Sequence, residues 1–211
     1  MQPNSPMIGI VNLEMGNLRS VKNAVLTCGH DIEQVDTPDG LENYSHLILP
    51  GVGHFGAGAR ALDEKGFRAP LAQHIAAGKP LLGLCVGMQL LATLGTEGGE
   101  FDGLGFVPGV VRRIPDKPGR AIPHVGWNSL NIRKKHPVLE GLKNDRDVYF
   151  VHSYAFHCDD AADLVAETDY GDPVTAIVGQ GSVIGMQFHP EKSQLNGLKL
   201  LENFGWWDGQ C

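Results

Sequence analysis

Residues 80–94 read Pro-Leu-Leu-Gly-Leu-Cys-Val-Gly-Met-Gln-Leu-Leu-Ala-Thr-Leu. The short apolar run Pro80–Leu84 is typical of a strand buried in a parallel sheet, and Met88–Leu94 has the composition of a helix. The stretch carries no charge, yet polar residues and glycines interrupt it before it reaches the roughly 20 apolar residues that cross a bilayer. We therefore expect a buried strand, a tight turn and a helix.

The same alternation extends toward the amino terminus. Apolar runs at Met7–Asn12 and His46–Pro50 predict two further buried strands. Asn17–Leu26 and Leu71–Ala77 have helical spacing, and each is followed by a glycine that can end a helix. Strands that alternate with helices form right-handed βαβ units, so this half is expected to build a parallel sheet.

Beyond residue 106 the pattern changes to strands with few helices between them. The expected strands are Val107–Ile114, Val148–His157, Leu164–Thr168, Val174–Val178 and Ser182–Phe188. Glycine-containing turns such as Gly179–Gly181 indicate hairpins, and Gln194–Phe204 is expected to be a closing helix. We predict an α/β fold: one three-layer domain over residues 1–211, with a mixed, largely parallel central sheet flanked by helices.

Composition narrows the class of protein. With 211 residues, 42% of them hydrophobic and 19% charged, the chain is neither disordered nor a coiled coil. A formal net charge of -7 without a basic stripe argues against nucleic acid as a ligand. The start, Met1–Pro6, lacks the features of a signal peptide, and the four cysteines form no CxxC pair. These features favour a cytoplasmic protein with reduced thiols and no membrane segment.

Cys85 is the candidate nucleophile because it stands between Gly83 and Gly87 where a strand should pass into a helix. The nucleophile elbow of hydrolases needs small residues at these two positions, since strand and helix approach each other closely there. Unpaired amides at a helix start favour a thiolate, and the Val86 amide would face an oxyanion formed on a carbonyl under attack. The alternative is that Cys85 is a small buried apolar residue.

The candidate base is His189, in the string Gln187-Phe188-His189-Pro190-Glu191 that follows an apolar strand. Strand ends of an open α/β sheet share one edge, which would bring His189 near Cys85. Glu191 can project to the same side as His189, fix its tautomer and stabilise the imidazolium. By itself, His-Pro-Glu is more often a surface turn.

Other chemistries have weaker support. His152, His157 and Cys158 cluster on one expected strand, but strand alternation keeps three such ligands from converging, so we expect no metal site. Ser153 has no elbow around it, which argues against a serine hydrolase. His124–Asn128 could be a simple turn.

A set of motifs together resembles the class-I, triad-type glutamine amidotransferases from Ile8 to about Phe204. The motifs are Met15–Val21, Pro50–Gly53, Gly83–Gln89, Pro123–Asn128, Phe150–Tyr154 and Gln187–Ser193. The cysteine and histidine motifs are shared across the class. Pro-Gly-Val-Gly and Pro-His-Val-Gly-Trp-Asn look like the glutaminase subunits of imidazole glycerol phosphate synthases, from histidine biosynthesis. The class also has a flavodoxin-like fold.

The resemblance implies hydrolysis of L-glutamine to glutamate and ammonia through a γ-glutamyl thioester on Cys85, without a cofactor. His189 would move the proton and Glu191 would orient it. The oxyanion hole would combine the Val86 amide with an amide of Gly51, Val52 or Gly53, in a loop whose peptide flip is held to link activity to the partner. Side chains or backbone at Gln89, His152, Ser153 and Tyr154 would hold the substrate.

The resemblance also implies a heterodimer with a (βα)8-barrel cyclase that receives ammonia through a channel. Positions expected near that interface are Asn17, Trp127, Tyr149 and Lys192. Asn12-Leu13-Glu14 departs from the usual family pattern, and the extension Met1–Pro6 and tail Trp206–Cys211 match nothing in it. Two alternatives remain: a stand-alone γ-glutamyl hydrolase, and a duplicated subunit that feeds a different synthase, for example in sugar amidation. A catalytically silent binding subunit has no support, because the nucleophile, the base, the carboxylate and Gln89 are all present.

Overall fold

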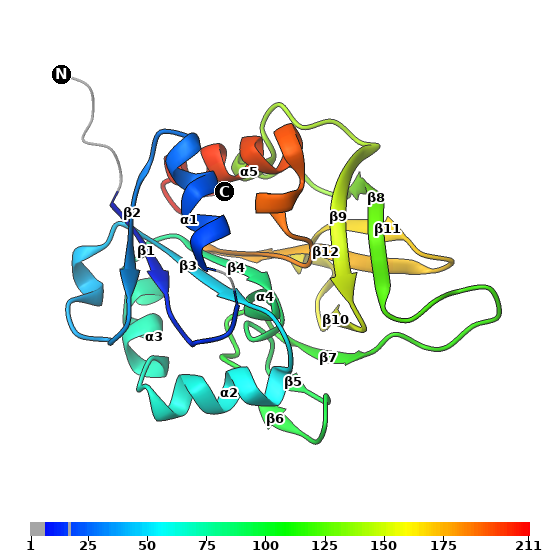
Figure 1. The fold of residues 1–211 in the computed structure, drawn as a ribbon, viewed down its shortest axis with the longest axis horizontal. Helices are drawn as coiled ribbons and strands as arrows, with labels where there is room; N and C mark the ends of the chain where they lie inside the picture. The colour runs from blue at the N-terminus through cyan, green and yellow to red at the C-terminus, as the bar shows by residue number, and fades with distance from the viewer. Residues whose placement is uncertain (1–6, 17) are drawn as a thin grey trace.

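The computed structural model describes residues 7–16 and 18–211. Within them, nine strands form one sheet in the order β2 (Asp31–Val35), β1 (Met7–Val11), β3 (His46–Gly51), β4 (Leu81–Cys85), β13 (Val183–Met186), β12 (Pro173–Gln180), β11 (Leu164–Asp169), β8 (His124–Ile132) and β9 (Arg146–His152). The pairs from β2 to β13 are parallel, and those from β13 to β9 are antiparallel (Figure 1). The expected α/β fold with a mixed sheet is confirmed.

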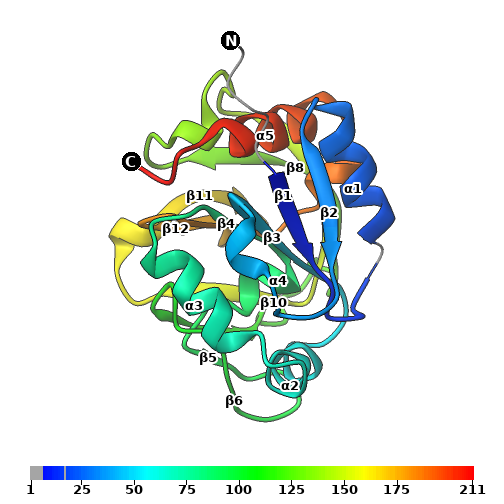
Figure 2. The ribbon, with the colours of Figure 1, turned by 90° about the vertical axis from the view of Figure 1, so that its left-hand side faces the viewer.

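Helices cover both faces of the sheet. Helices α1 (Leu18–Thr27) and α5 (Gln194–Trp206) lie over one face, and α2 (Phe55–Glu64) and α3 (Arg68–Ala76) lie over the other (Figure 2). Strand alternation divides the core accordingly: Ile48 packs with the α1 and α5 side chains, whereas Leu47 and Leu49 pack with those of α2 and α3. None of the described helices is long and apolar enough to cross a membrane.

A second, smaller sheet lies on the α2 side. Its order is β10 (Tyr154–Cys158), β7 (Gly109–Arg113), β5 (Leu94–Gly95) and β6 (Phe101–Asp102). Short 3₁₀ turns complete the described elements at η1 (Leu41–Asn43), η2 (Pro137–Leu139), η3 (Ala161–Asp163) and η4 (Pro190–Lys192).

Two sequence-based predictions about this region were wrong. The expected strand Val148–His157 is two strands, because the chain leaves the large sheet at Ser153 and pairs β10 with β7 in the small one. The expected helix Met88–Leu94 is the short α4 (Val86–Gln89). It stops early because the carbonyls of Leu90 and Ala92 accept amides of the following loop instead of continuing a helix.

The elements that were not predicted include α2, β2 and β8, and also the two-residue strands β5 and β6. Helix α2 contains Gly56 and Gly58, which made it look like a loop. A Cβ on Gly56 would lie 2.5 Å from Phe101, and one on Gly58 would lie 2.8 Å from Leu90, so these glycines allow α2 to pack closely. Strand β2 buries only Ile32 and Val35, which gave little apolar pattern to detect.

The tail Trp206–Cys211, which matched no family motif, contributes one side chain to the hydrophobic core, that of Trp207. Trp207 is 3% exposed, packs near Phe204 and His136, and accepts a hydrogen bond from Nε2 of His46 at its carbonyl. The adjacent Trp206 is 56% exposed. Within the described residues, its one aromatic neighbour is the ring of His30, which it meets in a T-shaped arrangement. The two tryptophans therefore differ: Trp207 closes the core beneath α5, and Trp206 faces outward.

Candidate active site

Cys85 is the last residue of β4 and immediately precedes α4, as the glycine spacing predicts. Its φ of 53° and ψ of −111° are unusual for a residue with a side chain, which is typical of a strained nucleophile turn. A Cβ on Gly83 would lie 2.7 Å from the Gly87 carbonyl oxygen, and one on Gly87 would lie 1.7 Å from the Leu49 oxygen. Both positions therefore require glycine for β3, β4 and α4 to meet.

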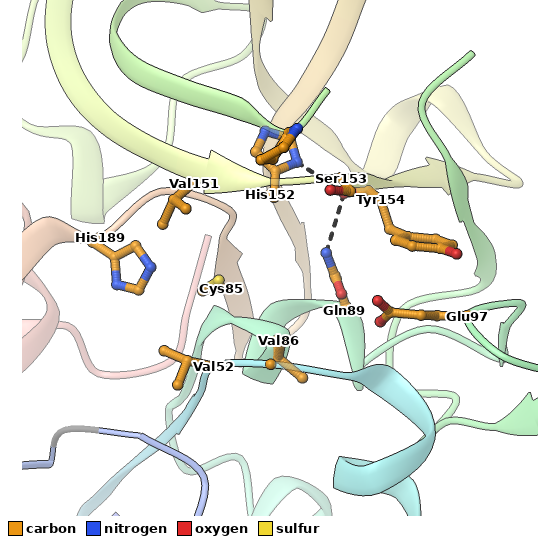
Figure 3. A pocket seen from close by; sticks show the side chains of 12 residues that line it. Val52, Cys85, Val86, Gln89, Glu97, Val151, His152, Ser153, Tyr154 and His189 are labelled. Atoms are coloured by element: carbon orange, nitrogen blue, oxygen red, sulfur yellow. Dashed lines mark hydrogen bonds between the residues drawn. The ribbon is translucent and has the colours of Figure 1, made fainter. Parts of the chain in front are cut away.

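His189 and Glu191 form a buried pair beside this turn. The Nδ1–H of His189 donates to Oε1 of Glu191 at 2.8 Å, and both side chains are nearly inaccessible to solvent. Burial by itself lowers the pKa of His189, but hydrogen bonding to Cys85 and Glu191 and their charges outweigh it and raise this pKa to about 9. The imidazole is turned toward Cys85 (Figure 3), so the imidazolium form is favoured where a thiol proton would arrive.

The backbone around His189 is held by the edge of the large sheet. The His189 amide donates to the Tyr149 carbonyl on β9, and the Tyr149 amide donates to Oγ of Ser193. Ser193 Oγ in turn donates to the His189 carbonyl at 2.6 Å. The segment 189–193 is therefore fixed against β9.

Cys85 and His189 line one pocket of about 260 Å³. The pocket is otherwise lined by Val52, Gly53, Val86, Gln89, Glu97, Pro123, Val151, His152, Ser153 and Tyr154 (Figure 3). All catalytic and substrate-binding residues expected from the sequence, except Glu191, line it, together with Val52, Gly53 and Val86 of the expected oxyanion hole. Glu191 reaches it through His189.

Glu97 is a pocket residue that sequence reasoning missed. Its Oε2 accepts the Phe55 amide at the start of α2, 2.8 Å away, which holds a carboxylate in the pocket wall. A carboxylate here suits a cationic group of a ligand. Its local sequence, Thr96-Glu97-Gly98, resembles an ordinary turn, so only the fold reveals its position.

The expected substrate residue His152 has both ring nitrogens engaged elsewhere. Nδ1–H donates to the Tyr154 carbonyl at 2.8 Å, and Nε2 lies 3.0 Å from Nδ1 of His124. Burial lowers the pKa of His152 to about 4, and the same cause lowers that of His124 to about 4, so both rings are neutral near pH 7. The His152 ring therefore has no free donor for a substrate.

In the loop expected to complete the oxyanion hole, one backbone amide already donates a hydrogen bond within the protein. The Val52 amide donates to the Met15 carbonyl at 3.2 Å. Gly51 pairs in register with Cys85 at the carboxyl ends of the neighbouring strands β3 and β4. Gly53, with a φ of 102°, adopts a conformation that favours glycine. Val86, in contrast, opens α4, where the first amides have no partner within the helix.

Three of the expected interface residues lie together. Trp127 on β8 faces Tyr149 on β9 edge-on at 5.9 Å, and Lys192 Nζ lies 6.0 Å from the Tyr149 ring. Trp127 is 48% exposed, and Val125 next to it is 54% exposed. We call Val125, Trp127, Tyr149 and Val151 the β8–β9 surface. Asn17, the fourth expected interface residue, lies outside the described residues.

The described residues contain no group of three or more His, Cys, Asp or Glu side chains placed to hold a metal ion. His152 lies on β9, whereas His157 and Cys158 lie on β10 in the other sheet. These three residues, which the sequence places close together, are thus divided between two strands in different sheets.

Comparison with known proteins shows similarity to glutamine amidotransferases over nearly the whole chain. The model of the family "Glutamine amidotransferase class-I" matches residues 10–206. A protein of Desulfitobacterium hafniense named imidazole glycerol phosphate synthase subunit HisH is 48% identical over 201 residues, covering 95% of this chain and 94% of that protein. A Nitrobacter winogradskyi protein named subunit HisH 2 of the same synthase is 43% identical over 208 residues, covering 95% and 98%.

Among solved structures, a crystal structure of a glutamine amidotransferase has a TM-score of 0.73 and 26% identity, covering 94% of this chain and 98% of that one. The structure of PurLQS from Thermotoga maritima has a TM-score of 0.75, covers 95% and 97%, and at 21% identity shows a common fold only.

Proposed function

Because the chain belongs to the class-I glutamine amidotransferase family, we propose that it is the glutaminase subunit of an imidazole glycerol phosphate synthase, acting in histidine biosynthesis. The observation that carries the chemistry is the strained Cys85 turn facing the buried His189–Glu191 pair across one pocket. The similarity to synthase subunits extends over nearly the whole chain, which favours this role over a stand-alone γ-glutamyl hydrolase.

The reaction follows from the residues around the pocket. Cys85 gives its thiol proton to His189, and the thiolate attacks the glutamine carboxamide carbon. The oxyanion meets the Val86 amide, and collapse expels ammonia, which takes the proton from His189, leaving a γ-glutamyl thioester. Water, deprotonated by His189, then cleaves the thioester to glutamate and restores the thiol. Glu97 is suited to hold the α-ammonium group of glutamine, since it presents a fixed carboxylate.

The occupied Val52 amide supports control by a partner. While it donates to the Met15 carbonyl, it cannot also donate to an oxyanion on the substrate. Loss of one such donor slows hydrolysis by roughly a hundred- to a thousandfold, about 3–4 kcal/mol. The free chain is therefore expected to hydrolyse glutamine slowly until this peptide reorients.

The partner we propose is a (βα)8-barrel cyclase that docks on the β8–β9 surface. Val52 and Val151 are both partly exposed and both line the glutamine pocket, so a subunit seated there would cover the pocket mouth. Ammonia leaving Cys85 would then pass into the partner rather than into solvent. We also propose a cytoplasmic location, where the four free thiols of Cys28, Cys85, Cys158 and Cys211 would stay reduced.

The test is glutamate release from glutamine by the purified chain, alone and with the cyclase and its nucleotide ligand. We expect slow release alone and strong activation in the complex. Cys85→Ala should abolish release in both while the complex still uses ammonium salts, and Cys211→Ala, at an exposed cysteine, is the control that retains activity. Undiminished glutamine turnover by Cys85→Ala would remove this cysteine from the mechanism. Full activity alone would favour a solitary hydrolase, and silence with the cyclase would favour a different synthase.

A further inference from the structure

The direction of the hydrogen bonds around Gln89 is set by a backbone carbonyl. The Tyr154 oxygen can only accept, and it receives Nε2 of Gln89 at 3.1 Å and Nδ1–H of His152 at 2.8 Å. A flipped Gln89 amide would place two oxygens against each other. Figure 3 shows the Gln89 nitrogen directed to Tyr154 and its oxygen directed away from it.

This direction determines the orientation of Gln187, a fully buried residue in the bend that connects β13 to His189. The second hydrogen of the Gln89 amide points to Oε1 of Gln187, 3.0 Å away, so Gln187 must present its oxygen there. Its Nε2 is then left on the other side, 3.9 Å from Sγ of Cys85. A buried amide with its donor toward the nucleophile costs free energy unless that donor has an acceptor.

We propose that Gln187 is a further residue of the glutamine-cleaving site, donating from Nε2 to the Cys85 sulfur while its oxygen orients Gln89. The proposal rests on the proposed function. A thiolate is a stronger acceptor than a thiol, so this contact strengthens when Cys85 ionises to attack. Among the described residues, the side chains that hydrogen-bond to Cys85 Sγ are those of Gln187 and His189.

The same arrangement gives Gln89 a role in selecting the substrate. With its nitrogen committed to Tyr154 and Gln187, only its oxygen remains to meet a ligand. An oxygen can accept from the N–H of a carboxamide but repels a carboxylate. Gln187 therefore helps the pocket to distinguish glutamine from the product glutamate.

The neighbouring histidines extend this ordered network. The donation from His152 to the Tyr154 carbonyl makes its Nε2 an acceptor for Nδ1–H of His124, whose own Nε2 lies 3.4 Å from Nδ2 of Asn128. Asn128 also donates to the Asp169 carbonyl at 2.7 Å. Backbone carbonyls at both ends thus hold these groups in one orientation, and Gln187 is the member nearest the nucleophile.

The test uses Cys85 alkylation by iodoacetamide, a small electrophile that needs neither glutamine nor a partner. We expect Gln187→Met, which keeps the side-chain length without the donor, to slow alkylation about fivefold at pH 7.5. Gln187→Glu should slow it about tenfold or more, because its carboxylate opposes a thiolate. Gln180→Met, at an exposed glutamine on β12, is the matched control and should stay within twofold of the wild type. Mass spectrometry locates the adduct, and Cys158, whose pKa burial raises to about 11, should react slowly.

Steady-state kinetics of the complex separate the two roles of Gln187. Gln187→Glu still accepts from Gln89, so it should lower kcat with KM within twofold, whereas Gln187→Met should lower kcat and also raise KM for glutamine severalfold. Circular dichroism melting identifies folded variants, and Gln187→Met decides the question if Gln187→Glu does not fold. Wild-type alkylation rates in a folded Gln187→Met would overturn the proposal. A wild-type complex that does not cleave glutamine would instead refute the proposed function, and the alkylation result would stand.

Discussion

Replacing Glu191 by glutamine removes the negative charge next to His189 while keeping the size of the side chain. The carboxylate now accepts the Nδ1–H of His189 at 2.8 Å in a buried setting. A glutamine oxygen could still accept this bond and hold the ring in place, but a neutral amide stabilises the imidazolium less. The substitution therefore tests the charge and not the geometry.

The expected magnitude comes from the pKa of His189, which is about 9 in the folded chain. Against an ordinary histidine value near 6.5, the imidazolium is favoured by roughly 3 kcal/mol, a stabilisation that Cys85 and Glu191 share. If Glu191 supplies about half, its loss weakens the charged pair by about 1.5 kcal/mol, or roughly tenfold. We expect kcat for glutamine in the complex with the cyclase to fall about 10- to 100-fold.

Stability should change with pH in a defined direction. The folded pKa of His189 is raised, so its stabilising effect is fully present below about pH 6.5 and is lost as pH rises through about 9. Urea unfolding at pH 6 and pH 9.5 should show this loss in the wild type and about half of it in Glu191→Gln. Glu64→Gln, at an exposed site on α2, serves as the control. The same pH dependence in Glu191→Gln and wild type, with unchanged kcat, would refute the reasoning.

Two further predictions concern the core and acid stability. Trp207→Ala should lower the free energy of unfolding by about 3–5 kcal/mol because it empties a buried site beside Phe204, whereas the exposed neighbour Trp206→Ala should change it by less than about 1 kcal/mol. Equal urea midpoints for the two variants would contradict the assignment of Trp207 to the core. Burial lowers the pKa of His124 and His152 to about 4, so the unfolded chain binds more protons, and stability should fall as pH drops from about 6.5 to 4. The loss should be of order 1–2 kcal/mol per histidine at pH 5, and a flat urea midpoint over this range would exclude it.

The parts of the site that could be predicted from sequence are those with local causes. The Cys85 turn was predictable because the glycines that it requires, Gly83 and Gly87, are two residues away on either side. Glu97 was not, because its place in the pocket depends on the Phe55 amide, 42 residues distant. The break at Ser153 was missed for the same reason, since apolar residues continue across it and only the pairing partners change.

The hydrogen bonds that attach residues 189–193 to β9 also affect how the chain behaves in solution. Strand β9 is the last of the nine-stranded sheet, and an open sheet edge can pair with strands of other molecules. Here the Tyr149 carbonyl accepts a hydrogen bond from the His189 amide, and the Tyr149 amide donates to Ser193 Oγ. The segment that carries the catalytic base is thus also a cover for an aggregation-prone edge. A substitution that loosens it would expose unpaired backbone next to the apolar β8–β9 surface and favour self-association of the damaged protein.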